Sequence, residues 1–199
     1  MTLQIAADFY IFELQDLVGR IEDWEDINQL ARAASSRGGG QPSRIERDFV
    51  NPMRILSLSM PPESSDTMRD AQFAFEGAMA RLTKATFGAR RDLPVEIEKG
   101  ALPTALASWE EGRVALGEFF AALNEATGLD EMRSPPAAGP NQIKEYGRSP
   151  RKYNDLVKKL KLCQNRGGPA LSQAWGKLMT SGYLQDSCGI PDMEAYFYQ

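Results

Sequence analysis

The chain has 199 residues, of which 25% are charged and 42% are hydrophobic, as is typical of one globular domain with or without an extension. The mean hydropathy of −0.40 and the lack of a long apolar run exclude a transmembrane helix from this sequence. The sequence contains no histidine, which excludes Ser-His-Asp and Cys-His catalysis, histidine-ligated metals and a histidine pH switch.

Helical periodicity predicts four amphipathic segments in the first two thirds of the chain. The first spans residues 8–35 and ends in a run of three glycines. The second spans residues 42–60, and Pro52 predicts a kink or break within it because proline has no amide hydrogen. The third begins near Ser64 or Ser65, which are suitable N-caps, and runs to residue 87. The fourth has Pro103 in its first turn and ends at Gly128.

These segments predict an all-α fold, an antiparallel four-helix bundle over residues 1–128. Residues 129–148 contain three prolines and few apolar side chains, so we interpret them as a linker. Residues 149–199 are expected to form a short helical C-terminal extension. Its two helices open at Ser149-Pro150 and at Pro169, where proline suits the first helical position.

Charge is distributed unevenly along the chain, whose net charge is −4. Residues 1–139 carry a net charge of −8, whereas residues 140–167 hold eight basic and two acidic residues. Such a segment steers an anionic partner, although a solvated helix face would have the same composition. Candidate docking residues are the basic Arg148, Arg151, Lys152, Lys158, Lys159, Lys161 and Arg166 and the aromatic Tyr196, Phe197 and Tyr198. The three aromatic residues either insert at a partner interface or fold back on the bundle.

The two cysteines, Cys163 and Cys188, cannot form a zinc site without further ligands. They either pair, closing a loop of about 25 residues, or remain two buried thiols. We expect a disulfide, which would indicate an oxidising compartment. The N-terminus lacks a targeting signal, as expected of a cytosolic protein or of a processed mature chain.

No catalytic template fits the sequence. The acidic residues on either side of Trp24 fall mostly opposite the apolar stripe, and Glu110 and Glu111 lack the Glu-x-x-His partners of di-iron bundles. The Arg-Gly runs lack the Gly-Lys-Ser/Thr ending of a phosphate-binding loop. We therefore expect no enzymatic activity, no catalytic or metal-binding residues and no cofactor. An enzyme built on carboxylates, lysine or tyrosine remains open.

Four stretches have the order and spacing of a known family. They are residues 17–27 (LVGRIEDWEDI), 49–60 (FVNPMRILSLSM), 71–82 and 105–123, the last of which contains EGRVALGEFF. Together they resemble the PsbQ-like extrinsic proteins of photosystem II. The segment LVKKLKLCQNRGGPALSQAW and the tail CGIPD…YFYQ resemble the C-terminal extension of these proteins in red-lineage algae such as diatoms.

The resemblance implies a four-helix bundle in the chloroplast thylakoid lumen, peripheral to the membrane. It implies docking on the lumenal face of the photosystem II core and on other extrinsic subunits, where the chain would shield the manganese-calcium cluster and help retain calcium and chloride. It implies no catalysis. The alternatives are a generic helical protein–protein interaction module and another lumenal photosystem subunit or assembly factor. A nucleic-acid binder is disfavoured by the acidic body of the chain.

Overall fold

The computed structural model describes residues 2–32, 42–89, 100–165, 167 and 170–181, and every regular element in this part of the chain is helical. The all-α expectation is therefore confirmed. The elements are α1 (Thr2–Phe9), η1 (Tyr10–Leu14), α2 (Gln15–Gly19), η2 (Ile21–Asp23), α3 (Trp24–Ala31), η3 (Glu46–Val50), α4 (Asn51–Leu58), α5 (Pro62–Ala85), α6 (Ala101–Thr127), α7 (Gln142–Tyr146), α8 (Pro150–Asn165) and α9 (Leu171–Ser181).

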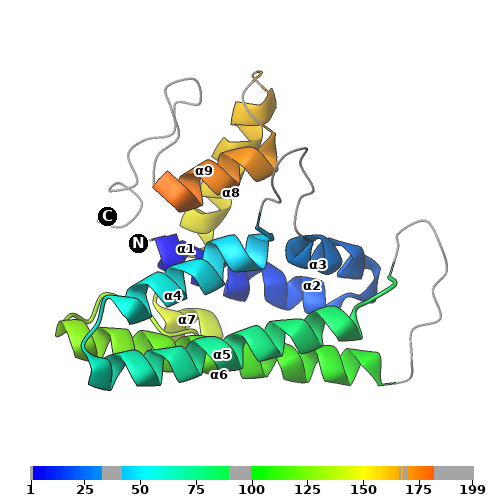
Figure 1. Ribbon diagram of the computed structural model, residues 1–199. Helices are drawn as coiled ribbons and strands as arrows, with labels where there is room; N and C mark the ends of the chain where they lie inside the picture. Colours follow the sequence, from blue (N-terminus) through cyan, green and yellow to red (C-terminus); the bar gives the residue numbers. More distant parts are fainter. Residues whose placement is uncertain (1, 33–41, 90–99, 166, 168–169, 182–199) are drawn as a thin grey trace.

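The helices lie in three tiers (Figure 1). The long helices α5 and α6 pack side by side and antiparallel, and α1 to α4 lie over them. Helices α8 and α9 stand on the far side of this middle tier, where both contact α1 and α9 also contacts η3. The middle tier is therefore covered on both sides, which explains why α1 is buried along almost its whole length.

The first helical segment differs from the prediction in where it begins and in a break within it. It begins at Thr2 and continues through the π-helical η1 to Gly19 with helical backbone angles at both junctions. It then breaks at Arg20, whose backbone is extended. The indole Nε1 of Trp24 donates a 3.0 Å hydrogen bond to the carbonyl of Val18 across this break. The single helix predicted over residues 8–35 is therefore two helices within the described range, and its end at the glycines lies outside that range.

The second segment opens with a capping box, in which Ser43 and Glu46 each accept a hydrogen bond from the other's backbone amide. The backbone stays helical past Pro52, which lies in the first turn of α4. The helix does not break at Pro52; the irregularity is η3, a π-helical turn that immediately precedes α4. A proline leaves one carbonyl without its α-helical donor, and a π turn is a common way to absorb that loss.

The third and fourth predicted helices agree with α5 and α6 to within about two residues. Helix α5 begins at Pro62, so Ser64 and Ser65 are not N-caps but lie in its first turn and donate to the carbonyl of Pro61. Helix α6 ends at Gly128, as predicted, with a φ of 67°. This left-handed conformation suits glycine, which has no Cβ to strain it.

The segment predicted as a linker is packed against the body. Residues 129–148 contain α7, whose Tyr146 is only 1% exposed. Gln4 on α1 accepts a 2.7 Å hydrogen bond from the amide of Arg133 and donates one of 2.9 Å to the hydroxyl of Tyr146. Prolines prevent a long helix here, but they do not prevent the segment from burying Gln142 and Tyr146 against the body.

Candidate functional site

Three acidic side chains of the N-terminal half hold the C-terminal helices in place, and the first is Asp8 on α1. Its carboxylate is 1% exposed and accepts hydrogen bonds of 2.6 and 2.7 Å from the guanidinium of Arg148. The hydroxyl of Tyr146 donates a third, of 3.0 Å. Tyr146 and Arg148 flank Gly147, whose φ of 66° turns the chain so that both side chains reach the same carboxylate.

The second acidic anchor is Glu13, which accepts a 2.6 Å hydrogen bond from the hydroxyl of Tyr153 on α8. The ring of Tyr153 is buried between Phe12, at 5.8 Å between centroids, and Trp175, at 6.3 Å. This tyrosine fixes the apolar face of α8 on the first helical segment. It does so with both a packed ring and a charge-assisted hydrogen bond.

The third anchor is Asp48 in η3, which is 1% exposed. It accepts 2.7 Å from the indole Nε1 of Trp175, 2.6 and 3.2 Å from Arg47, and 3.2 Å from Nε of Arg44. A buried carboxylate needs such partners because it has lost its hydration. Asp48 thus joins α9 to the middle tier.

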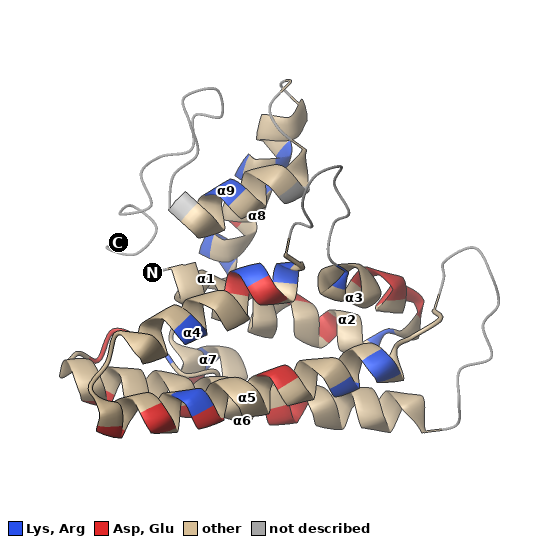
Figure 2. Ribbon diagram, in the orientation of Figure 1, with Lys and Arg blue, Asp and Glu red and all other residues tan. Residues whose placement is uncertain are grey.

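With its apolar face fixed, α8 turns its other side to solvent. Four exposed cations form what we call the basic face: Arg151, Lys158, Lys159 and Lys161. Asp155 lies 3.7 Å from Lys158 and offsets only part of this charge. Figure 2 shows blue Lys and Arg positions along the ribbons of α8 and α9, with little red between them. The structure therefore brings together the centre of the predicted basic segment as one exposed surface.

The remaining predicted docking residues have different positions. Arg148 is engaged with the buried Asp8, so its guanidinium is a structural ion-pair partner and its geometry does not support the docking role predicted for it. Lys152 is half-buried. Arg166, Tyr196, Phe197 and Tyr198 lie outside the described residues.

Cys163 is buried on α8. Its predicted disulfide partner, Cys188, lies outside the part of the chain that the structure describes, so the pairing stays a prediction.

Two buried tyrosines have altered acidity. Burial raises the pKa of Tyr146 well above its ordinary value, and the nearby Asp8 carboxylate raises it further. Burial likewise raises the pKa of Tyr10, with a smaller contribution from Glu110. Both hydroxyls therefore stay protonated and act as hydrogen-bond donors, Tyr10 to the carbonyl of Trp109 at 2.7 Å.

The sequence did not indicate the anchoring role of the three carboxylates Asp8, Glu13 and Asp48. Asp8 stands alone in the apolar run IAADFYIF, and a single charge in a buried helix signals a specific partner elsewhere. Among the described residues, no group of three or more His, Cys, Asp or Glu side chains is placed to hold a metal ion.

In the described helices, no stretch is both long and apolar enough to cross a membrane.

No protein family model, curated protein or solved structure matches the chain. Any function proposed for it must therefore be argued from its own residues.

Proposed function

We propose that the chain is a non-catalytic docking protein that binds an acidic surface of a larger assembly through the basic face of α8. One observation carries this proposal: α8 is held by buried anchors on one side and exposes Arg151, Lys158, Lys159 and Lys161 on the other. A helix fixed in this way holds the Cα positions of its cations in a constant arrangement, so little backbone freedom is lost on binding.

Such a basic surface is expected to increase the rate of association with an acidic partner more than it increases the binding affinity. Exposed ion pairs each contribute little, roughly 0–1 kcal/mol. Several cations together raise the association rate, and their effect falls as salt screens them. The acidic remainder of the chain would at the same time disfavour binding in other orientations, because like charges would face each other.

We further propose that the larger assembly is photosystem II, on its lumenal face. In this proposal the four helical segments over residues 2–127 form the bundle of a PsbQ-like extrinsic subunit, and α8 and α9 belong to its C-terminal extension. The role would be to shield and stabilise the oxygen-evolving manganese-calcium cluster and to help retain calcium and chloride. The support is the order and spacing of the four resembling stretches, together with the basic face.

Co-purification tests this assignment. Photosystem II would be isolated from thylakoids of the source organism, washed with concentrated salt, and the wash examined by mass spectrometry. We expect the chain to travel with the core, to be released by salt, and to take part of the oxygen-evolving activity with it. Absence from the photosystem fraction would contradict the photosystem assignment. It would leave a lumenal assembly factor or a generic helical interaction module as the leading functions.

Charge reversal tests the docking surface itself. The variant Lys158→Glu/Lys159→Glu/Lys161→Glu should rebind to salt-washed membranes at least tenfold more weakly at low ionic strength, since three favourable charges become repulsive. The matched control reverses three exposed cations of α4 and α5, Arg54, Arg69 and Lys84. Equal losses in both triple variants would show a general charge effect and would contradict a specific role for α8.

A further inference from the structure

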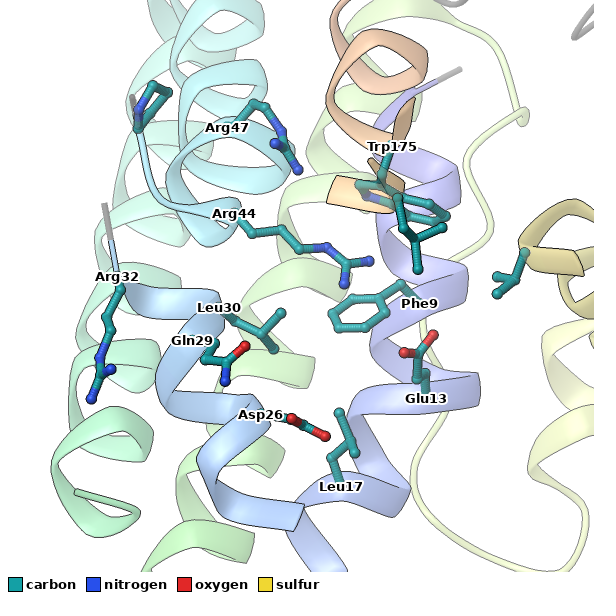
Figure 3. Close-up of a pocket in the computed structure, with 13 residues that line it drawn as sticks. Phe9, Glu13, Leu17, Asp26, Gln29, Leu30, Arg32, Arg44, Arg47 and Trp175 are labelled. Atoms are coloured by element: carbon teal, nitrogen blue, oxygen red, sulfur yellow. The ribbon is translucent and has the colours of Figure 1, made fainter. Parts of the chain in front are cut away.

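A cavity of about 470 Å³ lies between the first helical segment, α3, the start of the second segment and the C-terminal helices α8 and α9 (Figure 3). The docking function does not use it. Its volume lies within the range of small-molecule sites. Most of its wall is apolar, and the apolar lining residues are Phe9, Leu17, Leu30, Val157, Leu171 and Trp175.

One end of this cavity carries a fixed cation, Arg44. The guanidinium carbon lies 3.9 Å from the ring centroid of Phe9 and 4.6 Å from that of Trp175. Its Nε bonds to Asp48, and its side chain retains 24% exposure. Within the described part of the chain, the two terminal Nη groups of Arg44 donate no hydrogen bond.

This arrangement pre-organises Arg44 for an anion. Two aromatic rings and a carboxylate hold the guanidinium, so its orientation is set before a ligand arrives. The unused Nη groups can meet the oxygens of a carboxylate or sulfonate, the acceptors that suit an arginine fork. Arg47 also lines the cavity beside Trp175 and adds positive charge at this end.

The rest of the cavity lining carries both signs of charge, since Arg32 lines it as well as Asp26 and Glu13. Figure 3 shows Asp26 beside Leu17, and Glu13 on the other side of the Phe9 ring from Arg44. Glu13 accepts the hydroxyl of Tyr153, so it faces the cavity as a hydrogen-bonded carboxylate. The anionic group of a ligand is therefore assigned to Arg44, the cation whose Nη groups are unused.

We propose that this cavity binds an anionic amphiphile, with its carboxylate on Arg44 and its apolar body along Phe9, Leu30 and Leu17. The sign of the ligand's charge and the length of its apolar chain both decide binding. The proposal does not depend on the docking function, because the basic face and the cavity use different residues.

Isothermal titration calorimetry with dodecanoate as the probe tests the proposal. We expect saturable binding to one site below the micellar concentration. Dodecyltrimethylammonium, which has the same chain and the opposite charge, should bind at least about tenfold more weakly. Backbone amide shifts on adding dodecanoate should be confined to the elements that line the cavity: α1, η1, α2, α3, the start of the second segment, α8 and α9. Equal affinity for the two probes, or no saturable binding of dodecanoate, would overturn the proposal.

Two variants locate the site. Arg44→Gln removes the cation and should weaken dodecanoate binding about tenfold or more, and Arg54→Gln, on α4 outside this cavity, should leave it unchanged. Leu30→Trp fills the cavity from the wall that does not touch Asp48, and it should abolish binding. Leu58→Trp adds the same side chain at a position that is 72% exposed and should have no effect. If Arg44→Gln fails to fold, Leu30→Trp decides the matter alone, and unchanged binding in Leu30→Trp would contradict the proposal.

Discussion

The indole Nε1 of Trp175 lies 2.7 Å from Oδ2 of Asp48, a carboxylate 127 residues earlier in the chain. Both groups are buried, and two arginines complete the environment of the carboxylate. This hydrogen bond is a buried polar link between α9 and the middle tier.

Replacing Asp48 should therefore destabilise the fold strongly. Asp48→Ala leaves the indole of Trp175 and the guanidinium of Arg47 without their buried acceptor, and we expect a loss of about 3–5 kcal/mol in the free energy of unfolding. Urea unfolding followed by circular dichroism measures this loss. The control is Asp66→Ala, whose side chain is 81% exposed and which should change stability by no more than about 0.5 kcal/mol. A similar small effect for Asp48→Ala would contradict the anchoring role.

Replacing Arg148 should mainly reduce stability, whereas replacing Arg151, three residues later, should mainly reduce docking. Arg148→Ala leaves the buried Asp8 carboxylate without its ionic partner and should cost about 3–5 kcal/mol of stability. Arg151→Ala removes an exposed cation of the basic face and should cost no more than about 0.5 kcal/mol, while weakening docking. Thermal unfolding and membrane rebinding of the two variants separate these effects. A docking defect without loss of stability in Arg148→Ala would show that the guanidinium is available to a partner after all.

Gly112 on α6 should not tolerate a methyl group. A Cβ there would collide with the hydroxyl of Tyr10 and would lie 2.7 Å from Cε of Met79. We expect Gly112→Ala to cost about 1–3 kcal/mol through overpacking. Gly117→Ala on the same helix is the matched control, since its Cβ would meet nothing nearer than 3.9 Å. This second change should stabilise the helix by about 0.5–1 kcal/mol, and chemical unfolding of both variants would show whether the signs differ.

The buried tyrosines predict a loss of stability in alkali. The pKa of Tyr146 and that of Tyr10 are raised above 10.0 by burial. Because the folded state resists ionisation, the stability that these groups contribute is complete below the pKa of the unfolded chain, about 10. That contribution falls as the pH rises from there through the folded-state pKa. Tyr146→Phe should therefore reduce the slope of unfolding free energy against pH above about pH 10, measured in urea. An unchanged slope would show that Tyr146 ionises freely in the folded protein.

The local parts of the fold were predictable from the sequence, and the long-range parts were not. Helices α5 and α6 followed from apolar spacing and from Gly128, because helix formation depends on neighbouring residues. The break at Arg20 was missed because Ile21 continues the apolar spacing across it. The contacts of residues 129–148 with the body, through the buried Tyr146, were also missed, since they depend on Gln4 and Asp8, at the other end of the chain.

The candidate site was predicted in outline only. The density of Lys and Arg in residues 140–167 indicated the basic face, and the periodicity of Tyr153, Leu156 and Leu160 indicated which side of α8 would be buried. The same density included Arg148, whose guanidinium pairs with the buried Asp8, because composition does not show which cation has a buried partner. The cavity around Arg44 could not be predicted from the sequence, since its walls come from segments far apart in the chain.

The link between Asp8 and Arg148 spans 140 residues, and it sets an order of events during synthesis of the chain. At about 5–20 residues per second, the ribosome needs on the order of ten seconds to produce that interval. Until then, Asp8 cannot meet Arg148, Glu13 cannot meet Tyr153, and helix α1 lacks the cover of α8 and α9. The first helical segment therefore cannot complete its native contacts until the last quarter of the chain has emerged from the ribosome.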